Sequence, residues 1–292
     1  MTNAKILQHQ SDVAEELEAF FNELLFAQLP LEGKQTLYPL MEWFYTGFKY
    51  IKAGYQGLAD HYFDKGERYS QTLEKDSLTR QIMQIYYLPR KSYYLHKTGD
   101  PCAAEKMIFL ALEDMRKLES QGLEYVVFFR IQQYHNLARS YFYYGRTGDG
   151  IHITANLLVY LLTGRSETLP DLNVSLTMYP EKYEQLYYLT VVQVFFETMN
   201  VLAKLSADPG RYANSLLSSV LPAARLFRSL QEEARILQGC ILLFEAFYNG
   251  EYSRFCREAG EFVSGHPGKY QHYKKTLNIY IDWSKKLLIQ PV

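Results

Sequence analysis

The chain of 292 residues is long enough for one large helical array or for two ordinary domains. Hydrophobic residues make up 48% and charged residues 22%, a balance that excludes a disordered chain. The formal net charge of -1 gives no overall attraction to nucleic acid or to an anionic membrane, so we expect neither as a partner.

The cysteines and the start of the chain bear on the compartment. Cys102, Cys240 and Cys256 are widely spaced and form no CxxC pair, which favours reduced thiols over a disulfide framework. The first residues lack the basic start and continuous apolar core of a secretory signal, and no apolar run is long enough to span a bilayer. The sequence therefore predicts a cytoplasmic protein without a membrane segment.

Apolar residues at helical spacing predict a first helix near residues 4–27 and a second near 35–53. Pro30 and Gly33 break the chain between these two helices. Gly54 then marks the turn into a third helix, which extends to about residue 74.

The clearest helix–turn–helix join in the sequence follows a helix near 77–97. Gly99 ends that helix, Asp100 caps the next one, and Pro101 occupies the first helical position. We expect the helix that begins there to end at Gly122.

Two further helices, near 123–145 and 149–163, are predicted to fold back on each other around Gly145 and Gly148. The longest polar interruption of the chain follows, near 165–180. Such a long connection indicates either an insertion across the surface or a boundary between two halves.

Helical spacing resumes near 181–205 and continues to a last helix near 269–288. The breaks between these helices are Asp208-Pro209-Gly210, Gly250, and the segment 265–268. No segment of any length alternates with the period of a strand. The sequence therefore predicts an all-α fold of about twelve helices.

The turn glycines recur at a nearly constant spacing. Gly54 and Gly99 are 45 residues apart, and Gly99 and Gly145 are 46 residues apart. Self-similarity at this spacing is typical of helical solenoids, in which each helix pair stacks on its neighbours to bury its apolar face. We expect one repeat domain over 1–292, with a capping helix in 1–34, repeats over 35–267 with a polar insertion near 165–180, and a capping helix in 268–292.

Pieces of three units resemble the tetratricopeptide repeat family. These pieces are Asn136-Leu137-Ala138 with Tyr141-Phe142 and Gly145, Gly99-Asp100-Pro101 with Ala104 and Ala111, and Phe247 to Tyr252 with Ala259, Phe262 and Pro267. The units run longer than the ~34 residues of the family repeat. The chain therefore most resembles the long-helix variants found in bacterial peptide-sensing regulators and signalling scaffolds, which implies a right-handed superhelical solenoid of antiparallel helix hairpins.

In this family the concave groove is lined largely by the first helix of each pair. By this resemblance, the residues of the central unit that face the groove are Gln132, His135, Asn136, Arg139 and Tyr143. Asn136 and Arg139 would hold a peptide backbone or a carboxylate, since Arg supplies a planar fork of donors. The alternative is a solvated concave surface without a dedicated ligand.

No residue set in the sequence is typical of catalysis, of a metal site or of a cofactor site. Glu-x-x-His pairs, His-Glu-x-x-His, GxxxxGK[ST] and Gly-x-Ser-x-Gly are all absent. We interpret the glycines between Gly145 and Gly150 as an inter-helix turn rather than a phosphate site.

The leading hypothesis is a non-enzymatic scaffold that binds a protein or peptide segment on its concave face. The alternative is a regulatory protein that senses a peptide or small ligand and acts on a separate output partner. A helical enzyme with an unrecognised pocket is the third hypothesis. Residues 1–35 are mainly acidic and residues 265–292 mainly basic, so copies of the chain could also stack end to end, although polar capping of a solenoid explains the same charges.

Overall fold

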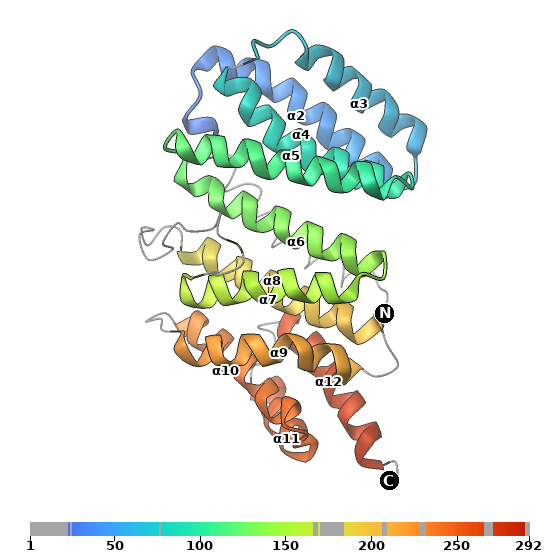
Figure 1. Cartoon of the computed structure of the whole chain (residues 1–292), viewed down its shortest axis with the longest axis vertical. Coiled ribbons are helices and arrows are strands. Elements are labelled where there is room, and N and C mark those ends of the chain that lie inside the picture. Colours follow the sequence, from blue (N-terminus) through green and yellow to red (C-terminus); the bar gives the residue numbers. More distant parts are fainter. Residues whose placement is uncertain are drawn as a thin grey trace. The chain divides into compact units, whose positions relative to one another are not determined.

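The computed structural model describes residues 23, 25–75, 77–165, 169, 184–205, 209–227, 232–265 and 271–289. Within these ranges every regular element is a helix and no strand occurs, so the predicted all-α fold is confirmed for this part of the chain (Figure 1). The predicted helix near 4–27 and the polar insertion near 165–180 lie largely outside it.

The chain divides into two compact units, one formed by Glu18–Ser140 and the other by Met1–Leu17 together with Tyr141–Val292. Below, the first is the N-terminal unit and the second is the C-terminal unit. The boundary falls near the end of one helix, not in the long polar connection. A single domain and a superhelical solenoid both stay predictions.

The N-terminal unit is built from helices that pack in chain order. α2 packs on α3, α4 packs on α5, and α2 also packs on α4. Such contacts between a helix, its successor and the helix after that bury an apolar stripe on each of them. The elements are α2 (Leu31–Lys52), α3 (Gln56–Ser70), α4 (Leu78–Lys97), α5 (Pro101–Ser120), the 3-10 helix η1 (Glu124–Val126) and α6 (Val127–Tyr143), whose last three residues belong to the C-terminal unit.

The predicted turn glycines do end helices. Gly54, Gly99, Gly145 and Gly250 all have positive φ, at 85°, 89°, 75° and 76°. Residues with a Cβ rarely adopt this left-handed conformation, which reverses the chain after a helix. The spacing read from the sequence is therefore a spacing of real turns.

The predicted cap of α5 is also present. The Asp100 side chain accepts a hydrogen bond from the Ala103 backbone N–H at 2.9 Å, and Pro101 opens the helix. The cap satisfies one of the free N–H groups of the first turn, and the proline ring pre-sets its φ.

The turn after α6 is shorter than predicted. The next helix, α7 (Thr147–Thr163), already includes Gly148 and Gly150, so only Gly145 makes the turn. Gly150 has a packing role instead, because a Cβ there would lie 2.6 Å from Cε1 of Phe142. This glycine lets the chain of α7 approach the Phe142 ring.

In the described part of the C-terminal unit, α7 is followed by the helices α8 to α12. α7 packs on α8 and α9, α9 on α10, α10 on α11, and α11 on α12. The bounds of the further helices are α8 (Glu184–Leu205), α9 (Pro209–Leu226), α10 (Glu232–Tyr248), α11 (Tyr252–Gly265) and α12 (Gln271–Ile289).

One contact in this unit joins helices that are far apart in sequence. α8 packs on α12, where Thr276 donates to Asn200 Oδ1 at 3.1 Å and the Tyr280 hydroxyl donates to the Met199 carbonyl at 3.0 Å. The rings of Phe196 and Tyr273 stack there with centroids 4.5 Å apart. A simple linear stack has contacts between neighbouring pairs alone, so α8 and α12 depart from that arrangement.

Candidate functional site

Helix α6 carries the five residues expected to line a groove, and their exposures differ. Gln132 and Asn136 are half-buried, and Arg139 and Tyr143 are exposed. His135 has 1% of its surface exposed, which corrects the expectation that its side chain lies on an open face. The physical reason is its register on the helix.

His135 falls on the buried stripe of α6, together with Ile131, Tyr134, Ala138 and Phe142 at spacings of one to four residues. Groove binding by the other four predicted residues stays a prediction.

Three helices of the N-terminal unit lie side by side through aromatic contacts. The rings of Phe48 on α2 and Tyr93 on α4 have centroids 5.0 Å apart in an edge-to-face arrangement. The rings of Tyr86 on α4 and Phe129 on α6 have centroids 6.0 Å apart. α4 therefore contacts α2 through one side chain and α6 through another, so the three alternate helices are linked through α4.

Aromatic–lysine pairs occupy the last turns of α2 and α4. The Lys49 ammonium lies 4.2 Å from the Tyr45 ring centroid, and that of Lys52 lies 5.1 Å from the Phe48 centroid. On α4 the Lys97 ammonium lies 5.6 Å from the Tyr93 centroid. These are cation–π distances, and each pair joins residues four apart on one helix.

We name these residues, with the exposed Arg139 of α6, the basic–aromatic strip. Its members are Tyr45, Phe48, Lys49, Lys52, Tyr93, Lys97 and Arg139.

The strip follows the register of the repeat. One position lies six residues before the turn glycine, and another lies two residues before it. In the successive repeats that end at Gly54, Gly99 and Gly145, the first position is occupied by Phe48, Tyr93 and Arg139. The second position is occupied by Lys52, Lys97 and Tyr143. Each of these three sequence repeats thus has one aromatic and one cationic residue at the two positions. In the third repeat the cationic residue comes first.

The strip concentrates positive charge. Burial lowers the pKa of His96, and the nearby charges of Lys97 on α4 and Arg139 on α6 lower it further. Cations in the last turn also stabilise a helix through its dipole, which is an ordinary structural role for lysines at these places. That role alone requires neither the aromatic residue four positions earlier nor the alignment between helices.

Of the four cations in the strip, Arg139 was predicted from the sequence as a binding residue, and Lys49, Lys52 and Lys97 were not. The signal was present as three aromatic-x-x-x-Lys pairs ahead of Gly54 and Gly99. Alignment of the units on their turn glycines would have found two of these pairs.

A second polar cluster joins α3 to α4. Glu67 Oε1 accepts from the Tyr87 hydroxyl at 2.7 Å and from the Lys91 ammonium at 2.6 Å. Burial, followed by the bond to Glu67, raises the pKa of Tyr87. Burial and the hydrogen bond to Asp60 raise the pKa of Tyr94 to about 12. Both phenols therefore stay protonated and donate, and the cluster fixes the two helices to each other.

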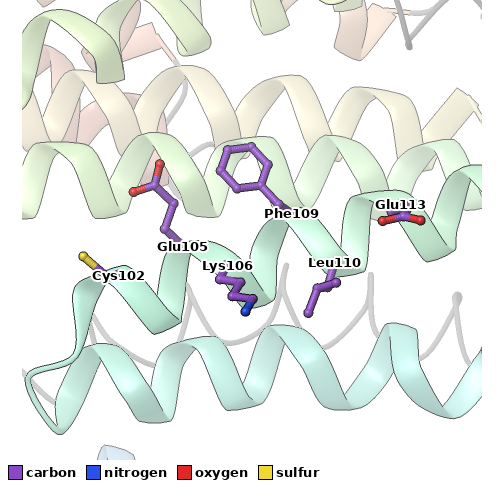
Figure 2. A pocket seen from close by; sticks show the side chains of 6 residues that line it. All are labelled: Cys102, Glu105, Lys106, Phe109, Leu110 and Glu113. Atoms are coloured by element: carbon purple, nitrogen blue, oxygen red, sulfur yellow. The ribbon is translucent and has the colours of Figure 1, made fainter.

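Helix α5 has a shallow hollow of about 390 Å³ on its exposed side. Figure 2 shows that its lining side chains all come from this helix, and they are Cys102, Glu105, Lys106, Phe109, Leu110 and Glu113. Phe109 is 50% exposed and Leu110 is 38% exposed. Because one helix supplies all the lining among the described residues, this part of the chain gives the hollow no opposing wall.

The described ranges contain neither a metal-site grouping nor a membrane-spanning helix. In those ranges no group of His, Cys, Asp or Glu has the arrangement of a metal site, and no helix is long and apolar enough to cross a membrane. Comparisons with protein-family models, with curated proteins and with solved structures found no match.

Proposed function

We propose that this chain is a non-enzymatic scaffold that binds a protein or peptide segment on the face formed by α2, α4 and α6. The observation that carries the proposal is the aromatic–lysine pair at the same register of α2 and α4, with Arg139 at the equivalent position of α6. Recurrence of one chemical pair across neighbouring helices suits a ligand that lies across them.

The rings of the strip support binding by holding its cations in place. A free lysine side chain loses rotamer freedom when it pairs with a ligand, which weakens association. Lys49, Lys52 and Lys97 already rest against rings, so less freedom remains to be lost. Rigid helices beneath them also fix the distances between the binding groups.

The wider architecture in this proposal is a right-handed superhelix of tetratricopeptide-like hairpins. It is supported by the spacing of about 45 residues between turn glycines and by the packing of α2 on both α3 and α4. We place the protein in the cytoplasm, a proposal supported by the free state of Cys102, Cys240 and Cys256.

Selection from a random peptide library on the immobilised full chain tests the function. We expect enriched peptides whose binding falls in the Lys52→Gln/Lys97→Gln double variant. Lys65→Gln is the charge-matched control for each of the two single changes, since Lys65 is an exposed lysine of the same unit that rests 4.2 Å from the Trp43 ring, outside the strip. The absence of any enriched peptide, or enrichment that the double variant leaves unchanged, would overturn the proposed binding face.

A further inference from the structure

The basic–aromatic strip presents its cations in a row. Lys49 and Lys52 stand on α2, Lys97 on α4 and Arg139 on α6, and all four are exposed. A ring covers one side of each lysine ammonium and leaves the other side toward solvent. Positive charge fixed on three neighbouring helices complements a ligand with several negative charges in a line.

The distance between the helices sets the spacing of those negative charges. Packed helices have axes about 8–10 Å apart. A peptide in the polyproline II conformation advances ~3.1 Å per residue with three residues per turn, or about 9 Å per turn. Side chains at every third residue of such a peptide therefore point the same way, at about the separation expected of packed helices such as α2 and α4.

We infer that the strip recognises an extended acidic peptide segment that carries a carboxylate at every third residue. The inference rests on the proposed function and specifies the chemistry of its ligand. The peptide crosses the helices, and successive carboxylates pair with Lys52 of α2, Lys97 of α4 and Arg139 of α6.

The same observations disfavour single-stranded nucleic acid, the other common polyanion. Such ligands are held by bases that stack on open aromatic faces. In the strip a lysine lies over each of Tyr45, Phe48 and Tyr93, and the last two rings also meet edge to face. The net charge of -1 provides no long-range attraction for a polyanion either.

Fluorescence anisotropy with two labelled peptides of identical composition tests the spacing on the full chain. One peptide consists of repeated Glu-Pro-Ala triplets, and the other has all its glutamates in one block. We expect the triplet peptide to bind about tenfold more tightly, because only its spacing lets three ion pairs form at once. Equal affinities, or tighter binding of the block peptide, overturn the inference.

Variants then test the place of binding. Lys52→Gln/Lys97→Gln should weaken binding of the triplet peptide by about tenfold, and Lys65→Gln should leave it within about twofold. The single variants Lys52→Gln and Lys97→Gln each remove one charge, as Lys65→Gln does. If all three single variants weaken binding equally, the peptide responds to net charge and not to the strip, which overturns the inference. If the double variant alters helical circular dichroism, the comparison of the two peptides on the unmodified chain still decides.

Two outcomes separate this inference from the proposed function. Library peptides that depend on Lys52 and Lys97 but carry no acidic residues overturn the acidic ligand and leave the scaffold function intact. Binding of labelled oligothymidylate at least as tight as that of the triplet peptide, and lost in the same double variant, assigns the strip to nucleic acid and overturns both.

Discussion

The Lys91 ammonium on α4 lies 2.6 Å from Glu67 Oε1 on α3, and the two side chains are 19% and 33% exposed. Here the lysine stem packs beneath the charge, with its ammonium 4.9 Å from the Tyr94 ring centroid. The ion pair therefore joins α3 to α4, and the ring contact lies on the same ammonium.

Replacement of Lys91 by Met should destabilise the protein by about 1–2 kcal/mol. The methionine keeps the packing of the stem, but Glu67 is left half-buried with a charge that has lost its cation. Adding Glu67→Gln should recover part of the loss, with a coupling free energy of about 1 kcal/mol in urea unfolding.

The exposed ion pair of Lys117 with Glu113 at 3.2 Å is the matched control. Lys117→Met should change the free energy of unfolding by less than about 0.5 kcal/mol. Equal losses for Lys91→Met and Lys117→Met would contradict the role given to burial.

The lowered pKa of His96 predicts a dependence of stability on pH. The imidazole has a lower pKa in the folded chain than the usual 6.5 or so. Below pH ~6.5 the unfolded chain binds a proton that the folded chain does not bind. Stability from this group should therefore fall as pH decreases from about 6.5 toward the folded pKa, and His96→Gln should remove this part of the slope.

The cause of the shift can be tested at the neighbouring cation. Lys97→Gln removes a charge that disfavours the imidazolium, so the His96 pKa should rise in an NMR titration of the imidazole protons. An unchanged His96 pKa would show that Lys97 does not act on this group.

Two adjacent residues of α5 should respond very differently to truncation. Ile108 is 3% exposed and Phe109 is 50% exposed. Ile108→Ala should cost about 2–4 kcal/mol, because it removes buried methyl groups and leaves a cavity. Phe109→Ala should change the free energy of unfolding by less than about 1 kcal/mol. Chemical denaturation of the two variants measures both, and a larger loss for Phe109 would show that its face of α5 is covered.

Two glycines of the C-terminal unit provide a similar contrast. Gly150→Ala should destabilise the protein by about 1–3 kcal/mol, because its Cβ would lie 2.6 Å from the Phe142 ring. Gly239 lies in α10 with nothing within 4 Å of an added Cβ, so Gly239→Ala should stabilise the protein by up to about 1 kcal/mol. Thermal unfolding followed by circular dichroism measures the change in stability of both variants. A change of the same sign in both would contradict this account.

Features that depend on a few neighbouring residues could be predicted from the sequence. Gly99, Asp100 and Pro101 determine a turn, a cap and a first helical residue through their own backbone preferences, and the structure has all three. The all-helical class followed in the same way from apolar spacing.

Features that depend on contacts between helices could not be predicted in this way. The open face expected for His135 came from a resemblance to a repeat family and not from the contacts of this chain. In the structure the side chain lies on the buried stripe of α6. Phe48 and Tyr93 meet across α2 and α4, so the strip emerges only once those helices are packed side by side.

The packing of α8 on α12 has a consequence for synthesis of the chain. Three hydrogen bonds between these helices join residues 76, 81 and 85 positions apart in the sequence. Contacts of such long range slow folding, because the intervening chain must be ordered before they form. On the ribosome, the part of the apolar surface of α8 that α12 buries therefore stays uncovered until residues 271–289 have emerged.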